Sequence, residues 1–453
     1  MADQPAKIRD VAWGEMFPWL IIVRSVRIAL LARVLVLGAA GLLATMLGWW
    51  VIAELFSKST DPVITSWPRG AGLTMWEQTA GTGAANSWVN TTARSAGEVF
   101  DSAWSNLIQA PIAIWAYLTR PFIQMFHADL TATGFLFLLL CGVWELLVWG
   151  LFGGAITRIA ALKFTRDEAP GMLAALKHAA SKWLSYSLPP LVALAGTAVF
   201  ALQLVALGFV MRIDVLAFVA ALAWPFVILL GLMMAILLLG ALAGWPLMWA
   251  TVSVEGTDAF DALSRSYAYT YHRPWRLLFY VVFAGFLAVV SMFAVKLFAS
   301  SAVALGNWSI DWGLDDATMR SVVAPYPLDV TPPEAPKIEV VPGAKEVGTA
   351  TAPTELPASP LELNNIQRST RTIIHFWKAL VAALVAGYQA GFLWVSAVGI
   401  YLLLRRDVDG VQMSEVYVDE AEEYGLPPLT DDLVTGVPAV TPHAPAVPGD
   451  TSA

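Results

Sequence analysis

The chain has little charge and almost no cysteine. Charged residues make up 14% of its 453 residues, against roughly 25% in an ordinary soluble domain. The single cysteine, Cys141, excludes an intramolecular disulfide framework. The basic residues form no patch with interleaved aromatics, which leaves nucleic-acid binding without support. Hydrophobic residues make up 57% of the chain, and this balance indicates a helical protein that crosses a membrane several times.

Sequence motifs for catalysis and for metal or nucleotide binding are also absent. The chain contains no HExxH, Walker A, GxSxG or CxxC pattern. Its five histidines are scattered, without a second histidine four residues on or a cysteine neighbour, so a zinc site has no basis. The acidic pairs Asp315-Asp316 and Asp431-Asp432 read as solvated surface, because hard cations need several converging oxygens. We therefore expect a protein that is not an enzyme and that binds no cofactor or metal.

Six hydrophobic segments are long enough to cross a bilayer, which takes about 20 apolar residues. They are residues 29–52, 133–156, 188–211, 216–254, 277–303 and 374–404. No polar turn divides the long fourth segment, and Pro225 and Pro246 are interpreted as kinks within one span. The expected fold class is all-α, a polytopic membrane protein of about six transmembrane helices with two amphipathic cytoplasmic elbow helices.

The spans divide the chain into seven parts. These are a cytoplasmic amphipathic N-terminus (1–28), the first transmembrane helix (29–56), an outer loop (57–132), transmembrane helices two to five (133–303) with elbow helices near 167–186 and 257–272, a Pro-rich outer loop (304–373), the sixth transmembrane helix (374–404) and an acidic tail (405–453). Within the first loop, residues 106–126 are apolar but contain Pro111 and Pro121. We expect an interfacial or re-entrant helix there, because a full crossing would invert every later span.

Orientation follows from the basic residues near the span ends. Of the 27 lysines and arginines, 15 lie on one side, mostly in short segments beside spans. This distribution places both termini in the cytoplasm. The last 49 residues hold ten acidic and two basic residues and account for the whole net charge of −8. Their acidity and their prolines predict a disordered cytoplasmic tail.

Two cytoplasmic connections, residues 157–187 and 255–276, share a layout of span, amphipathic helix and span. The pairs aligned at an offset of 87 residues are Glu168 with Glu255, Ala175 with Ala262 and Leu176 with Leu263. Such a layout predicts a parallel repeat about an axis along the membrane normal. Chance matching in apolar sequence is the alternative, since only three identities support the alignment.

The segment EGTDAFDALSRSYAYTYHRPWRLLFY resembles the span–elbow–span unit of uncharacterised bacterial multipass inner-membrane families. It is similar to the membrane domain attached to some glycerophosphodiesterases and to Yip-like membrane proteins. The residues that carry the resemblance are Ala262, Leu263, Ser266, Arg273, Trp275 and Arg276. GGAITRIAAL and YLLLRRDVDG also resemble segments of an uncharacterised bacterial family. The resemblance covers about 50 residues and implies a bacterial inner-membrane location, but no defined activity; the phosphodiesterase domain itself is absent.

Glu145 is the most informative ionisable residue, because it lies near the middle of the second span, where a carboxylate is costly. It is a candidate site for a proton, a cation or a polar group of a substrate, with Gln203 of the third span as a candidate partner. The structural alternative is a protonated glutamate that is hydrogen-bonded to a neighbouring helix. In the second elbow, Asp261, Arg265, Arg273 and Arg276 are candidate cytoplasmic docking residues.

Small residues in two spans predict close packing between helices. Gly153-Gly154 lies in the second span, and Gly387 and Gly391 form a GxxxG pair in the sixth. Because this motif carries no chemistry of its own, it indicates packing only.

These features favour a non-enzymatic scaffold that organises lipid or protein partners. Its partners would be membrane lipid and a membrane or cytoplasmic protein, bound through the elbow helices and the acidic tail. The alternative is a small-solute or lipid transporter or channel that uses Glu145. That alternative ranks second because the spans contain few polar residues to form a path. The oligomeric state stays open.

Overall fold

The computed structural model describes residues 17–67, 110–127, 129–168, 170–314 and 364–417, the isolated positions Phe100 and Trp104, and two short strands in the tail. Within these residues, six helices are long and apolar enough to cross a membrane. They are α3 (Ala32–Leu55), α9 (Ala132–Thr165), α11 (Trp183–Val210), α13 (Trp224–Glu255), α15 (Pro274–Asp311) and α17 (Asn365–Asp409). The all-α, multi-pass architecture with six such helices is therefore confirmed.

Shorter helices connect or precede the six long ones. They are η1 (Pro18–Val23), α2 (Arg24–Ala29), α4 (Pro62–Thr65), α8 (Ala110–Gln124), α10 (Met172–Ser181), α12 (Asp214–Leu222) and α14 (Ala259–His272). The helices α10 and α14 occupy the two expected elbow positions. The apolar helix α8 has 15 residues, fewer than the about 20 that a crossing needs.

The fourth span starts later than the sequence pattern predicts. The short helix α12 ends at Leu222, and α13 begins at Trp224. The expected kink at Pro225 is wrong, because this proline lies in the first turn of α13. A proline there costs no intrahelical hydrogen bond and favours the start of a helix. Pro246, in contrast, lies inside α13.

The sixth span is longer than its apolar segment, because polar residues extend its start. It begins at Asn365 rather than at residue 374. The side chain of Asn364 accepts a hydrogen bond from the Gln367 amide at 2.9 Å, and the Gln367 side chain accepts one from the Asn364 amide at 3.1 Å. This reciprocal capping box stabilises the start of a helix. The expected Pro-rich loop is therefore helical at both ends, because α15 runs to Asp311 and α17 begins at Asn365. Residues 315–363 lie outside the described residues.

The tail contains one piece of extended structure. Strand β1 (Leu429–Asp431) pairs antiparallel with β2 (Pro438–Val440), with Thr430 opposite Ala439. The expectation of a tail without any structure is therefore wrong for these six residues. The rest of the tail beyond Tyr417 lies outside the described part of the chain.

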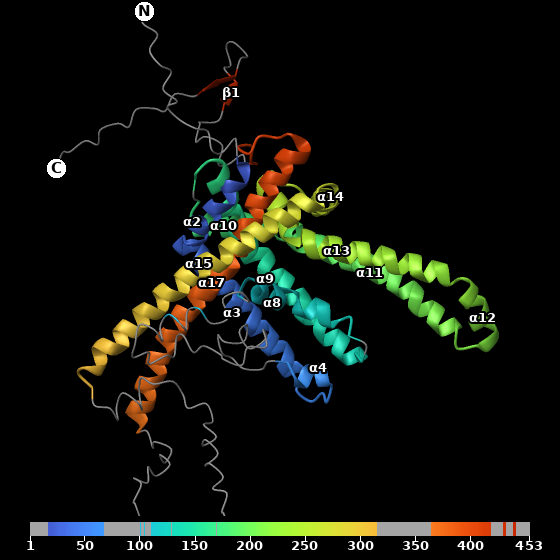
Figure 1. Cartoon of the computed structure of the whole chain (residues 1–453), viewed down its shortest axis with the longest axis horizontal. Helices are drawn as coiled ribbons and strands as arrows, with labels where there is room; N and C mark the ends of the chain where they lie inside the picture. The colour runs from blue at the N-terminus through green and yellow to red at the C-terminus, as the bar shows by residue number, and fades with distance from the viewer. Residues whose placement is uncertain are drawn as a thin grey trace, which may run out of the picture.

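Three pairs of long helices diverge from one end of the molecule, where α2, α10 and α14 gather (Figure 1). We call this the elbow end. One pair is α3 with α9, one is α11 with α13, and one is α15 with α17 (Figure 1). Helix α17 also packs along α3 and lies at the centre. In an apolar 18-residue stretch of α17, 83% of the residues are buried inside the structure. The corresponding share is 11% in α11 and 11% in α13.

The expected close packing at glycines is present. A Cβ atom added to Gly153 would lie 2.5 Å from the ring of Trp249, and one added to Gly391 would lie 2.7 Å from Val34. Real Cβ atoms do not approach other atoms so closely, so both positions need glycine for the helices to pack as they do. The GxxxG pair of the sixth span therefore packs against α3.

Candidate functional site

Glu145 lies in the middle of α9 and is fully buried. Cys141 and Trp149 lie one helical turn before and after it on the same face. Neither of its two carboxylate oxygens has a hydrogen-bond partner within the described part of the chain. A buried polar group without a partner costs free energy, and a carboxylate inside a membrane costs more. Glu145 is therefore held at a position where its side chain contributes no structural hydrogen bond.

Helix α8 brings two polar side chains to this region. The guanidinium of Arg120 lies 4.5 Å above the centre of the Trp67 ring. The Tyr117 ring lies 4.8 Å from the Trp49 ring. The indole of Trp49 in turn donates a hydrogen bond of 3.1 Å to the Cys141 carbonyl on α9. These contacts hold α8 against Trp49 of α3, which in turn binds α9 one turn from Glu145; α8 also contacts α9 directly.

Gln203 does not meet Glu145. It is exposed on α11, and its side-chain amide donates to the Val199 carbonyl of its own helix at 3.4 Å. The expected pairing is wrong because α11 leaves the bundle with α13, so similar depth along the sequence gives no proximity (Figure 1). The polar residue that does reach the neighbourhood of Glu145 is Tyr117, in the first loop, and Arg120 lies one turn further along the same helix. Their signal in the sequence is a tyrosine and an arginine three residues apart in an apolar segment.

A carboxylate at the end of α13 joins three elements at the elbow end. Glu255 forms ion pairs with Arg265 of α14 at 2.6 Å and with Arg405 of α17 at 3.0 Å. The hydroxyl of Tyr401, also on α17, donates to the same carboxylate at 2.5 Å. We call these four residues the elbow network. It fixes the end of α13 relative to α14 and α17.

A second set of contacts joins α17 to the elbow and to α15. Asp407 forms an ion pair with Arg276 at 2.6 Å and accepts a hydrogen bond from Tyr280 at 3.1 Å. The hydroxyl of Tyr269 on α14 donates to the carboxylate of Asp409. Burial, and then this hydrogen bond to Asp409, raise the pKa of Tyr269, so its hydroxyl stays a donor at neutral pH.

The four candidate docking residues therefore divide into two groups. Arg265 and Arg276 are both engaged within the chain, although each side chain stays partly exposed. Asp261 lies exposed in the first turn of α14, and its backbone amide donates to Asp258 at 3.0 Å. Arg273 lies exposed at the junction of α14 and α15. Docking at these residues stays a prediction, and Asp261 and Arg273 are the pair that an external partner can reach.

The chain after α17 folds back onto the elbow end. The backbone amide of Tyr417 donates to the Val254 carbonyl at 2.7 Å, and Arg158 donates to the Tyr417 carbonyl at 2.8 Å. Lys182 donates to the Gly256 carbonyl at 2.8 Å and lies 5.5 Å from the centre of the Tyr417 ring. We call the segment 410–417 the tail anchor. It contacts α9, α13 and the start of α11.

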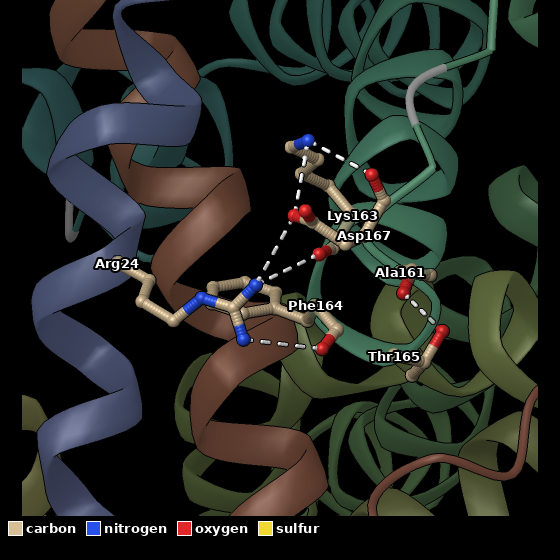
Figure 2. Close-up of polar contacts among 6 residues, drawn as sticks. All are labelled: Arg24, Ala161, Lys163, Phe164, Thr165 and Asp167. Atoms are coloured by element: carbon tan, nitrogen blue, oxygen red, sulfur yellow. Dashed lines mark hydrogen bonds and ion pairs between the residues drawn. The ribbon is translucent and has the colours of Figure 1, made fainter.

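The N-terminal helix α2 is joined to the end of α9 by a polar contact (Figure 2). Arg24 donates to the carbonyls of Lys163 and Phe164 at 3.2 and 3.4 Å. Asp167 forms ion pairs with Lys163 at 3.0 Å and with Arg24 at 3.5 Å. The hydrogen bond and charge of Lys163, with a smaller effect from Arg24, lower the pKa of Asp167.

No group of three or more His, Cys, Asp or Glu side chains that could hold a metal ion occurs among the residues that the structure describes. Comparisons of the chain with protein-family models, with curated proteins and with solved structures found no match. The geometry of the chain itself therefore has to carry any functional proposal.

Proposed function

We propose that the protein is a non-enzymatic scaffold of a bacterial inner membrane that organises lipid or a partner protein. The observation that carries this proposal is the pair α11 and α13, with α12 between them, which we call the arm (residues 183–255). Only 11% of an 18-residue apolar stretch in each of its long helices is buried inside the structure. The arm points away from the other four long helices (Figure 1).

Side chains of α14 hold the arm along α13, from the middle of this helix to its elbow end. The hydroxyls of Tyr267 and Tyr271 donate to the carbonyls of Leu237 and Ile236, at 2.6 and 2.5 Å. Ser266 donates to the Gly244 carbonyl at 2.7 Å. These bonds join the elbow helix to α13, and the elbow network holds the end of α13. Because α13 is bonded to α14, the arm has a fixed direction. Its apolar sides therefore face outward at a constant position.

The outer surface of the arm is apolar over most of its length. Its exposed large side chains include Val199, Leu202, Phe209, Phe218, Phe226 and Ile228. Within a bilayer such a surface contacts lipid tails or the helices of another protein. The exposed Asp261 and Arg273 at the base of the arm would add a cytoplasmic contact for the same partner.

A photo-crosslinking experiment in native membranes tests this proposal. A photoreactive residue is placed at Leu202 or Phe226 on the arm, and at the equally exposed Phe286 of α15 as a matched control. We expect one discrete protein or lipid product from the arm positions and none from Phe286. The same partner should co-purify with the wild type and be lost when Phe209 and Phe226 are replaced by alanine. Identical products from the arm and from Phe286 would contradict a dedicated arm.

The second candidate is a small-solute or lipid transporter or channel that uses Glu145. The burial of this carboxylate without a hydrogen-bond partner in the described chain favours it. Flux measurements on reconstituted protein test it, with Glu145→Gln as the variant and Glu54→Gln as the control. Transport through Glu145 requires that the first change abolishes the flux and the second leaves it intact.

A further inference from the structure

The long helices that pack against α9 are α3, α11, α13 and α17, and they bring no charge close to the middle of the bundle. The helices α3 and α13 have charged residues only within two positions of an end, α11 has none, and residues 379–404 of α17 have none. The titratable groups that face Glu145 are Tyr117 from α8 and Cys141 from its own helix. Among the residues that the structure describes, no countercharge therefore lies directly beside this carboxylate.

Tyr117 places a buried hydroxyl between the region of Glu145 and Arg120. Its ring packs on Trp49, whose indole donates to the Cys141 carbonyl one turn before Glu145. Tyr117 and Arg120 are three residues apart on α8, so both lie on one face of that helix. The Tyr117 hydroxyl and one guanidinium nitrogen of Arg120 have no hydrogen-bond partner in the described chain. Three buried polar groups that are not hydrogen-bonded to one another thus follow in the order Arg120, Tyr117 and Glu145.

This series begins near one end of the bundle. Arg120 stacks on the ring of Trp67, which follows α4 two residues after its end. Helix α4 contacts α9, and the side chain of Asp61, the residue before α4, accepts a hydrogen bond from Thr131 next to the first turn of α9. The Trp67 indole nitrogen also lacks a partner in the described chain. Polar groups therefore mark a line from this end of α9 toward its middle.

We propose that Glu145, Tyr117 and Arg120 form an intramembrane proton-binding site. Retaining several buried polar groups without mutual hydrogen bonds is costly, and inside a membrane such groups mark sites of function. The proposal goes beyond the scaffold and needs no transported solute, because a proton can bind and leave without anything else moving.

The ligand is a proton rather than a metal cation. Hard metal cations need several oxygen ligands, and the described titratable side chains that face Glu145 supply one further oxygen, the Tyr117 hydroxyl. The guanidinium of Arg120 repels a metal cation. A proton needs only one carboxylate oxygen: it is taken from hydronium, leaves water behind, and forms a covalent O–H bond on Glu145. Release to water reverses these changes.

Arg120 and Tyr117 set the proton affinity of this site. The O–H of Tyr117 can donate to an ionised Glu145, and the positive charge of Arg120, one helical turn further along α8, acts in the same direction from a greater distance. Removing either one should therefore let Glu145 hold its proton to higher pH. The conservative change Arg120→Lys keeps the charge and should keep the affinity near that of the wild type.

Labelling with dicyclohexylcarbodiimide, a hydrophobic reagent that adds to protonated carboxyl groups, tests the site. The full chain is reconstituted in liposomes and labelled between pH 5 and pH 9, and the adduct is located by mass spectrometry. We expect labelling at Glu145 that falls as the pH rises, and none in Glu145→Gln. Tyr117→Phe should move the pH of half-maximal labelling upward, and Arg120→Gln should move it in the same direction by a smaller amount.

Two controls keep the outcome interpretable. Glu54→Gln, at the exposed end of α3, should leave the labelling of Glu145 unchanged. Size-exclusion chromatography identifies variants that do not fold, and the wild-type measurement needs no variant at all. The proposal is overturned if Glu145 is not labelled at any pH, if its labelling is independent of pH, or if folded Arg120→Gln and Tyr117→Phe both titrate like the wild type.

Discussion

Gly38 of α3 and Gly387 of α17 bring the backbones of two long helices into direct contact. A Cβ atom on Gly38 would lie 2.3 Å from the Gly387 carbonyl oxygen, and one on Gly387 would lie 2.3 Å from the Leu35 carbonyl oxygen. Small residues permit this approach, which gains van der Waals contact and weak Cα–H···O interactions where lipid supplies no hydrophobic driving force. The crossing places the most buried helix, α17, against the start of the chain.

This contact predicts that Gly387→Ala destabilises the protein. The added methyl group meets backbone atoms, which cannot rotate away, so the helices must separate. We expect a loss of about 1–3 kcal/mol in the free energy of unfolding, measured by thermal or denaturant unfolding in detergent. Gly231→Ala in α13 is the matched control, because nothing lies within 4 Å of its added Cβ. Equal losses in the two variants would show that the crossing is not as close as described.

The number of spans and the close packing of Gly387 could be predicted from the sequence, because apolar length and small residues are local signals. The divergence of the three helix pairs could not. Whether Gln203 lies near Glu145 depends on which helices pair, and α11 pairs chiefly with α13 rather than with the helices around Glu145. Apolar faces of similar composition give no indication of their partner.

The elbow network predicts a strong effect of Glu255→Gln. This change removes the charge that Arg265 and Arg405 share, and leaves the largely buried Arg405 guanidinium without its carboxylate. We expect a loss of about 1–3 kcal/mol in the free energy of unfolding, below the value for a fully buried pair because Arg265 is partly exposed. Scanning calorimetry in detergent measures it. Glu415→Gln, an exposed change that keeps the backbone carbonyl bound by Arg405, should have almost no effect.

The contact in Figure 2 predicts an acid dependence at the N-terminal helix. Because the pKa of Asp167 is lowered from its usual 3.8, its ion pairs favour the folded arrangement above that pH. This contribution is lost as the pH falls through the folded-state pKa. An NMR titration of the Asp167 carboxyl should therefore give a midpoint below 3.8. Lys163→Met should raise the midpoint; if it does not, Lys163 is not the main cause of the shift.

The polar sites differ in how much of each could be predicted from the sequence. Glu145 stands out because any carboxylate within an apolar span does. Its neighbours Tyr117 and Arg120 come from a segment broken by prolines, and only packing onto α9 reveals them. Arg265 and Arg276 are recognisable as polar elbow residues, but their partners Glu255 and Asp407 belong to other helices. Pairings between distant segments are properties of the tertiary structure and leave no local pattern.

The tail anchor predicts that two glycines with the same backbone conformation differ sharply when replaced by alanine. Gly256 and Gly410 both end a helix with positive φ, 65° and 70°, so alanine strains each backbone by roughly 1–2 kcal/mol. Only at Gly256 would the added Cβ also clash, at 2.5 Å, with the ring of Tyr417. Gly256→Ala should therefore displace the anchor and expose residues 410–417 to protease, whereas Gly410→Ala should leave them protected. Limited proteolysis with mass spectrometry distinguishes the two, and equal cleavage would mean that Tyr417 does not hold the tail at this position.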